Sequence, residues 1–121
     1  MGGRRKCIAA LALAVGLTLG TSGIADAVTV GVRGISSGGT FVWSPTTRTV
    51  HHGTVVRWTA ASGSHTVKSW GGNWRFSRTL PRGTSTSRVF HQFGKFRFFC
   101  TFHGRIRNGR CFGMCGRIIV R

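Results

Sequence analysis

Acidic side chains are nearly absent from this sequence of 121 residues, in which one Asp, Asp26, and no Glu stand against 18 Lys and Arg residues. A glycosidase with paired carboxylates needs two acids, so that class is excluded. A Ser-His-Asp triad, or a Mg²⁺ or Ca²⁺ site with oxygen ligands, needs at least one acid, and only Asp26 could supply it. Tyr is missing as well. The chain therefore has almost no means of carrying out carboxylate chemistry.

What the sequence does contain is typical of one small folded domain. Hydrophobic residues make up 40% of it, including nine Phe and four Trp. This content argues against disorder even though the formal net charge is +17. The starting description is a small, basic domain that is rich in aromatic residues and glycine.

The first 27 residues have the three-part pattern of a secretory signal peptide. Residues 1–6 carry three basic side chains, residues 7–20 are apolar and uncharged, and residues 21–27 are small and polar, ending in Ala25-Asp26-Ala27. The apolar run is shorter than the roughly 20 residues that span a membrane. We predict cleavage after Ala27, a domain formed by residues 28–121, and a secreted or periplasmic location.

Export changes the composition of the working domain. Loss of residues 1–27 removes three of the 18 basic residues and the only acid, so 15 Lys and Arg remain. Three cysteines remain, Cys100, Cys111 and Cys115. Disulfides persist in an oxidising compartment, and an odd number of cysteines means that at least one thiol has another fate.

The domain is predicted to be all-β, because short runs with strand character alternate with Gly, Ser and Pro and no helical period is sustained. About seven strands of this kind indicate an antiparallel sandwich or barrel. Within 54–59, Val56 and Trp58 share one face. The predicted strands are 28–33, 41–43, 54–59, 65–70, 84–90, 95–100 and 117–121.

The run 95–100 predicts which way its side chains point. Phe96, Phe98 and Cys100 fall on one face, and the basic residues alternate with them on the other. Because the basic face must meet solvent, we expect Cys100 to point into the core. Phe99, on the basic face, is expected to lie outside.

Four soft donors are the candidate chemistry. Cys100 and His103 form a C-x₂-H pair at the end of that strand, Met114 precedes the last strand, and His65 begins another strand. One thiolate, two imidazoles and a thioether are the donors of a blue-copper centre, with copper in the plane of the thiolate and imidazoles and the Met bond long and axial.

The sequence resembles the cupredoxins, the small blue copper proteins similar to plastocyanin, pseudoazurin and halocyanin. This resemblance implies a Greek-key β-sandwich with eight strands and one type 1 copper ion at one end, bound by His65, Cys100, His103 and Met114. It also implies a carrier of single electrons and not an enzyme, because four ligands leave no clear open position for a substrate. The residues that carry the resemblance are Phe41, Pro45, Val50, Gly53, Thr54, Val56, Trp58, Ser64 to Val67, Phe76, Leu80, Gly83, Phe90, Gly94, Phe96, Phe98, Cys100, His103, Gly104, Gly113, Met114, Gly116 and Ile118 to Val120.

Cys111 and Cys115 bracket Met114 and have three interpretations. They form a disulfide across the long ligand loop, they are free thiols, or they complete a closed zinc site with Cys100 and His103. The disulfide accounts for the odd cysteine count as one pair plus one metal thiolate. The zinc site leaves His65 and Met114 without a role.

The positive charge predicts the kind of partner. It attracts an acidic redox protein and also an anionic membrane or cell-wall surface, with no specific nucleic-acid partner expected. Arg105, Arg107 and Arg110 are expected to surround the exposed edge of His103 and to steer the acidic partner there. We expect a monomer. Two other functions compete with electron transfer, namely a copper carrier or chaperone and a basic β-sandwich without metal that binds anionic polymers.

Overall fold

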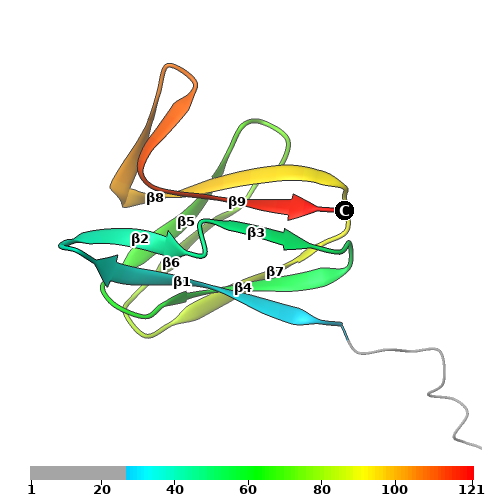
Figure 1. Ribbon diagram of the computed structural model, residues 1–121, viewed down its shortest axis with the longest axis horizontal. Coiled ribbons are helices and arrows are strands. Elements are labelled where there is room, and N and C mark those ends of the chain that lie inside the picture. Colours follow the sequence, from blue (N-terminus) through cyan, green and yellow to red (C-terminus); the bar gives the residue numbers. More distant parts are fainter. Residues whose placement is uncertain (1–26) are drawn as a thin grey trace, which may run out of the picture.

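A computed structural model describes residues 27–121, so the predicted signal peptide lies outside the described residues except for Ala27. The all-β prediction is confirmed, because the described chain forms nine strands and no helix, and hence no helix that could cross a membrane (Figure 1). The strands are β1 (Thr29–Ser37), β2 (Thr40–Ser44), β3 (Thr47–Val50), β4 (Thr54–Ala60), β5 (His65–Trp70), β6 (Ser77–Leu80), β7 (Ser85–Phe90), β8 (Gly94–Arg107) and β9 (Arg110–Val120).

The strands form two packed sheets. One has the order β2-β1-β4-β7 and the other the order β3-β9-β8-β5-β6. β1 runs parallel to β4 and β3 runs parallel to β9, and the remaining pairs are antiparallel. β3 and β6 were not predicted. Each is an edge strand of four residues with only its last residue buried, so neither shows a hydrophobic alternation.

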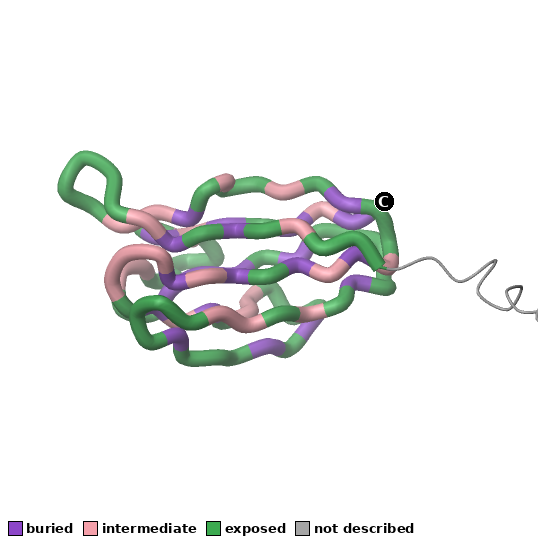
Figure 2. The backbone as a smooth tube through the Cα atoms, turned by 90° about the horizontal axis from the view of Figure 1, so that it is seen from below, coloured by how far each residue is buried: buried purple, intermediate pink, exposed green. Residues whose placement is uncertain are grey.

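The core between the sheets is largely aromatic. Buried and exposed residues alternate along several strands, most clearly along β4 (Figure 2). Trp58 is fully buried, with ring centroids 5.4 Å from both Phe76 and Phe98. The predicted inward face of β8 is confirmed, because Phe96, Phe98 and Cys100 are all buried. These side chains anchor the strand that delivers Cys100.

The prediction that Phe99 lies outside is wrong, because only 8% of this residue is exposed. Phe99 pairs with Lys68 of β5 on one side and with Cys115 of β9 on the other. Side chains paired across antiparallel strands lie on the same face, so the side chains of Lys68 and Cys115 flank Phe99 on that face.

The region between His103 and Met114, expected to be a loop, is a β-hairpin. We call its residues 104–113 the arm. The arm turns at Asn108 and Gly109, whose φ angles are 51° and 72°. Two consecutive positive φ angles are typical of a type I′ turn, which favours Asn-Gly. The arm stands away from the sandwich in Figure 1 and projects beyond it in Figure 2.

Candidate metal centre

The centre forms where the ladder between β8 and β9 is interrupted. The two strands pair up to Phe99 and Cys115, and they pair again from Gly104 and Gly113. Between these pairs, the four residues from Cys100 to His103 face the single residue Met114. Three of the four predicted donors therefore come from one irregularity of the sheet, which frees their side chains from regular strand alternation.

His65 supplies the fourth donor from the first residue of the neighbouring strand, β5. Its Nδ1 lies 3.8 Å from the Sγ of Cys100, and the Nδ1 of His103 lies 3.5 Å from the same sulfur. The donor atoms of these three residues all lie within 4.8 Å of one another. His65 and Cys100 are fully buried, whereas His103 is half-buried.

One hydrogen bond determines which nitrogen of His65 is free. Nε2 lies 2.7 Å from the carbonyl oxygen of Ser62, which can only accept, so Nε2 carries the proton and Nδ1 keeps its lone pair. Burial lowers the pKa of His65; the bond to Ser62 opposes this shift, and repulsion from His103 adds to it. The ring is thus held in the neutral form that a metal ligand requires.

Two threonines support the Cys100 sulfur. The backbone N–H of Thr66 donates to Sγ over 3.3 Å, which stabilises negative charge on the sulfur. The backbone N–H of Thr101 donates to the Thr66 hydroxyl over 2.7 Å, and the two hydroxyls lie 2.9 Å apart. These bonds join β5 to the chain that leaves Cys100.

Met114 is fully buried and lies against β1 beside the His65 ring. A Cβ atom on Gly34 would lie 2.6 Å from Cδ2 of His65 and 3.1 Å from Cε of Met114. Both side chains therefore fill the space that a larger residue would occupy. The Phe41 ring closes the centre, with centroids 5.1 Å from His65 and 4.4 Å from His103.

Cys111 and Cys115 form a disulfide, and Cys100 is a free thiol. The first interpretation of these two cysteines is therefore confirmed. The pairing excludes both the free thiols and the zinc site built from Cys100, His103, Cys111 and Cys115, because a disulfide sulfur is not available as a thiolate.

The chemistry of the donors suits copper. Residues 27–121 contain no Asp or Glu, so no side-chain carboxylate of this domain can take part. A buried thiol and two Nδ1 atoms, with buried Met114 packed near the His65 ring, are the soft donor set that suits a type 1 copper ion. The orienting bond from His65 to a backbone carbonyl is the support that metal-bound histidines usually have.

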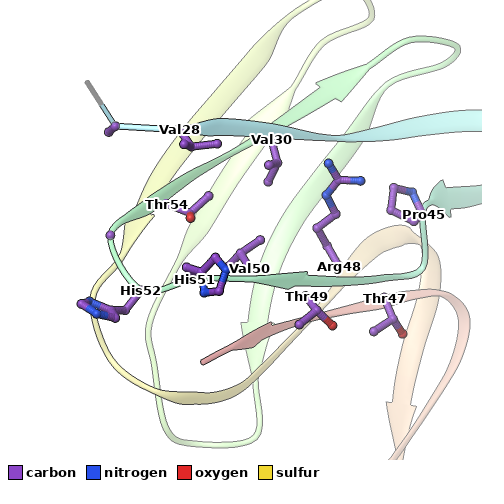
Figure 3. A pocket seen from close by; sticks show the side chains of 12 residues that line it. Val28, Val30, Pro45, Thr47, Arg48, Thr49, Val50, His51, His52 and Thr54 are labelled. Carbon is purple, nitrogen blue, oxygen red and sulfur yellow. The ribbon is translucent and has the colours of Figure 1, made fainter. Parts of the chain in front are cut away.

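A cavity of about 560 Å³ lies at the other end of the sandwich, between β1 and β3. Figure 3 shows Arg48 pointing into it beside Val30 and Pro45. None of the four donors lines it. His51 and His52 lie at its rim and are exposed, as solvated side chains would be. This cavity is therefore separate from the candidate metal centre.

Comparisons with known proteins identify the fold. No protein-family model and no curated protein matches the sequence. The chain is similar to a purple cupredoxin from Nitrosopumilus maritimus, with 22% identity, a TM-score of 0.55 and coverage of 79% of this chain and 100% of that one. It is also similar to pseudoazurin from Methylobacterium extorquens AM1, with 18% identity, a TM-score of 0.60 and coverage of 76% and 74%.

A third likeness is to part of a larger protein, a Cu-containing nitrite reductase from Thermus scotoductus SA-01. The identity is 19% and the TM-score 0.62, and the match covers 90% of this chain and 25% of that one. All three likenesses are structural. The chain thus has the cupredoxin fold, and the predicted cupredoxin-like sandwich is confirmed.

The four predicted donors lie together in the structure, but the residues that position them were not predicted. Gly34, Ser62 and Thr101 contact the donors or their partners, yet no local pattern distinguishes them from other small residues. The arm could have been found, because Asn108-Gly109 between alternating side chains is a strong signal for a hairpin.

Proposed function

We propose that this chain is an exported copper protein that carries single electrons through a site of His65, Cys100, His103 and Met114. The observation that carries the proposal is the convergence of three donor atoms within 4.8 Å in the interrupted ladder, with Met114 buried beside them. Copper bound there would supply one-electron Cu(II)/Cu(I) chemistry. Four protein donors leave no open position for a substrate, so the proposal is a carrier and not an enzyme.

The way the chain holds its donors supports electron transfer. His65, Cys100 and Met114 come from three neighbouring strands and are fully buried, so packing restrains them in both copper oxidation states. His103 is half-buried and borders a surface hollow of about 530 Å³ whose other lining residues are uncharged. We propose that the electron enters and leaves through this ring.

Export is proposed from the pattern of residues 1–27, and the Cys111–Cys115 disulfide fits an oxidising compartment. The competing function is a copper carrier that releases its metal. Repeated voltammetric cycles in the presence of a Cu(I) chelator distinguish the two. The proposal predicts reversible cycles without copper loss. Loss of copper to the chelator in the reduced form would instead support the carrier.

The arm carries the charge that we propose for partner recognition. Its register places Arg105 opposite Phe112 and Arg107 opposite Arg110, so three guanidinium groups and one ring share a face. Arg105 and Arg110 lie over the Phe112 ring, 5.6 Å and 5.8 Å from its centroid. All three arginines are exposed. We propose that this face steers an acidic redox protein toward His103.

A triple variant, R105Q/R107Q/R110Q, is expected to slow electron transfer from hexacyanoferrate(II), an anionic reductant, by about tenfold at low salt. The effect is expected to fade as salt is added, because screening shortens the reach of exposed charges. Stopped-flow measurement of copper reduction checks both expectations.

The matched control is R57Q/R75Q/R121Q, which removes the same charge from exposed positions outside the arm. It is expected to slow the reaction less than the arm variant does. Equal slowing by the two variants would show that net charge alone attracts the reductant and would contradict steering by the arm.

A further inference from the structure

The Cys111–Cys115 disulfide crosses the same interruption of the ladder that holds the metal donors. Cys111 belongs to the arm and pairs with Ile106, whereas Cys115 belongs to the sheet and pairs with Phe99. We infer that this disulfide is a clamp that positions Met114 as the fourth donor and that its opening loosens this donor selectively. The inference rests on the proposed copper site.

The clamp holds the chain in a sharp bend. Five residues of regular strand would separate their first and last Cα atoms by about 13 Å, but the Cα atoms of Cys111 and Cys115 are 6.1 Å apart. The chain bends at Gly113, whose φ of +88° suits glycine, and a side chain there would collide with the His103 carbonyl. The bend carries Met114 into the core.

Met114 depends on the clamp more than the other donors do. In the described ladder it is the one residue of β9 that faces the interruption and has no register partner on β8. Its side chain is long and unbranched, so it adapts readily to a shifted backbone. The other donors have their own supports: Ser62 for His65, Thr66 for Cys100 and Phe41 for His103.

The disulfide is also within reach of solvent. Both Cys111 and Cys115 are half-buried, in contrast to the fully buried Cys100. A reductant can therefore open the clamp in the folded protein without first exposing Cys100. Opening leaves the thiolate and both imidazoles in place and changes only the freedom of the thioether.

The first test needs no metal. The methyl group of Met114 is observed by carbon-13 NMR in metal-free protein, in three forms: the oxidised chain, the chain with its disulfide reduced, and C111S/C115S. The inference predicts one narrow resonance in the oxidised chain and a broadened resonance, moved toward the position of an unfolded methionine, in the other two. An unchanged Met114 resonance in the reduced chain and in C111S/C115S would overturn the inference.

Two controls accompany this test. The indole resonance of Trp58 reports whether the core of each form stays folded. If C111S/C115S does not fold, the wild type with its disulfide reduced still tests the inference. Gly109→Ala strains the tip of the arm, where φ is +72° and no atom lies within 4 Å of the added carbon. This variant leaves the clamp closed, and we expect the Met114 resonance to stay unchanged.

The second test uses copper-loaded protein and a double-mutant cycle. C111S/C115S is expected to change the reduction potential and the ratio of the thiolate charge-transfer bands when residue 114 is Met, and to change neither in a Met114→Leu background. Equal changes in both backgrounds would show a general structural role and overturn the inference. If the wild type binds no copper, the proposed function fails, whereas the metal-free measurement still tests the clamp.

Discussion

Gly34→Ala is expected to weaken copper binding by about 10- to 100-fold or more while the sandwich stays folded. The added carbon would lie 2.6 Å from Cδ2 of His65, 3.0 Å from its Nε2 and 3.1 Å from Cε of Met114. Relief of these contacts requires His65 or Met114 to move, because the backbone of β1 is held by β2 on one side and β4 on the other. Either movement changes the donor geometry, and Cu(II) titration followed by absorption measures the result.

Gly31→Ala is the matched control for this prediction. It lies three residues earlier in the same strand, and the nearest atom to its added carbon is a backbone oxygen 4.0 Å away. The control is expected to bind copper as the wild type does. Normal copper binding by Gly34→Ala would mean that neither His65 nor Met114 is held where the account places it.

Trp58→Ala is expected to lower the free energy of unfolding by about 3–5 kcal/mol, a large share of the roughly 5–15 kcal/mol of a typical domain. Trp58 is fully buried and its ring contacts Phe76, Phe90 and Phe98, which come from both sides of the core. Its removal leaves a cavity beside Phe98, the β8 residue two positions before Cys100. Chemical denaturation of metal-free protein, followed by circular dichroism, measures the loss.

Trp58→Phe distinguishes the contribution of the side chain's volume to stability from that of its indole N–H group. The indole Nε1 of Trp58 donates to no acceptor among the described residues, so phenylalanine removes an unpaired buried donor together with part of the ring. It is expected to cost clearly less than alanine. A loss below about 1 kcal/mol for Trp58→Ala would show that this ring does not hold the two sheets together.

The four candidate donors could be selected from the sequence because their signals are local. Alternation along one strand predicted that Cys100 faces the core. Its spacing to His103, together with the thioether of Met114, indicated the donor set of a blue-copper centre. The supports were not predictable because they depend on tertiary neighbours. Gly31 and Gly34 look alike in the sequence, and only the fold places one of them against His65 and Met114.

The errors in the predicted fold have the same origin. Phe99 was predicted outside from the alternation of its strand, yet it is buried between its paired neighbours on β5 and β9. β3 and β6 are edge strands whose exposed residues give no periodic signal. In both cases the burial of a residue depends on the neighbouring strand and not on its own sequence context.

The near absence of acidic residues also determines the charge of the domain's surface. Because residues 27–121 contain no Asp or Glu, every charged side chain of the described residues is basic, and the arm holds three of them beside one end of the sandwich. This charge does not define the chemistry of the centre, which comes from sulfur and nitrogen donors. We propose that it selects the surfaces that the centre can approach.

The most direct test of the account is the visible absorption of purified protein, without residues 1–27, after addition of Cu(II). The proposed copper site should give an intense thiolate-to-copper charge-transfer band in the wild type and none in Cys100→Ser, a variant of nearly the same size that lacks the sulfur. A folded wild type that stays colourless with Cu(II) would contradict the copper site and favour a basic β-sandwich without metal.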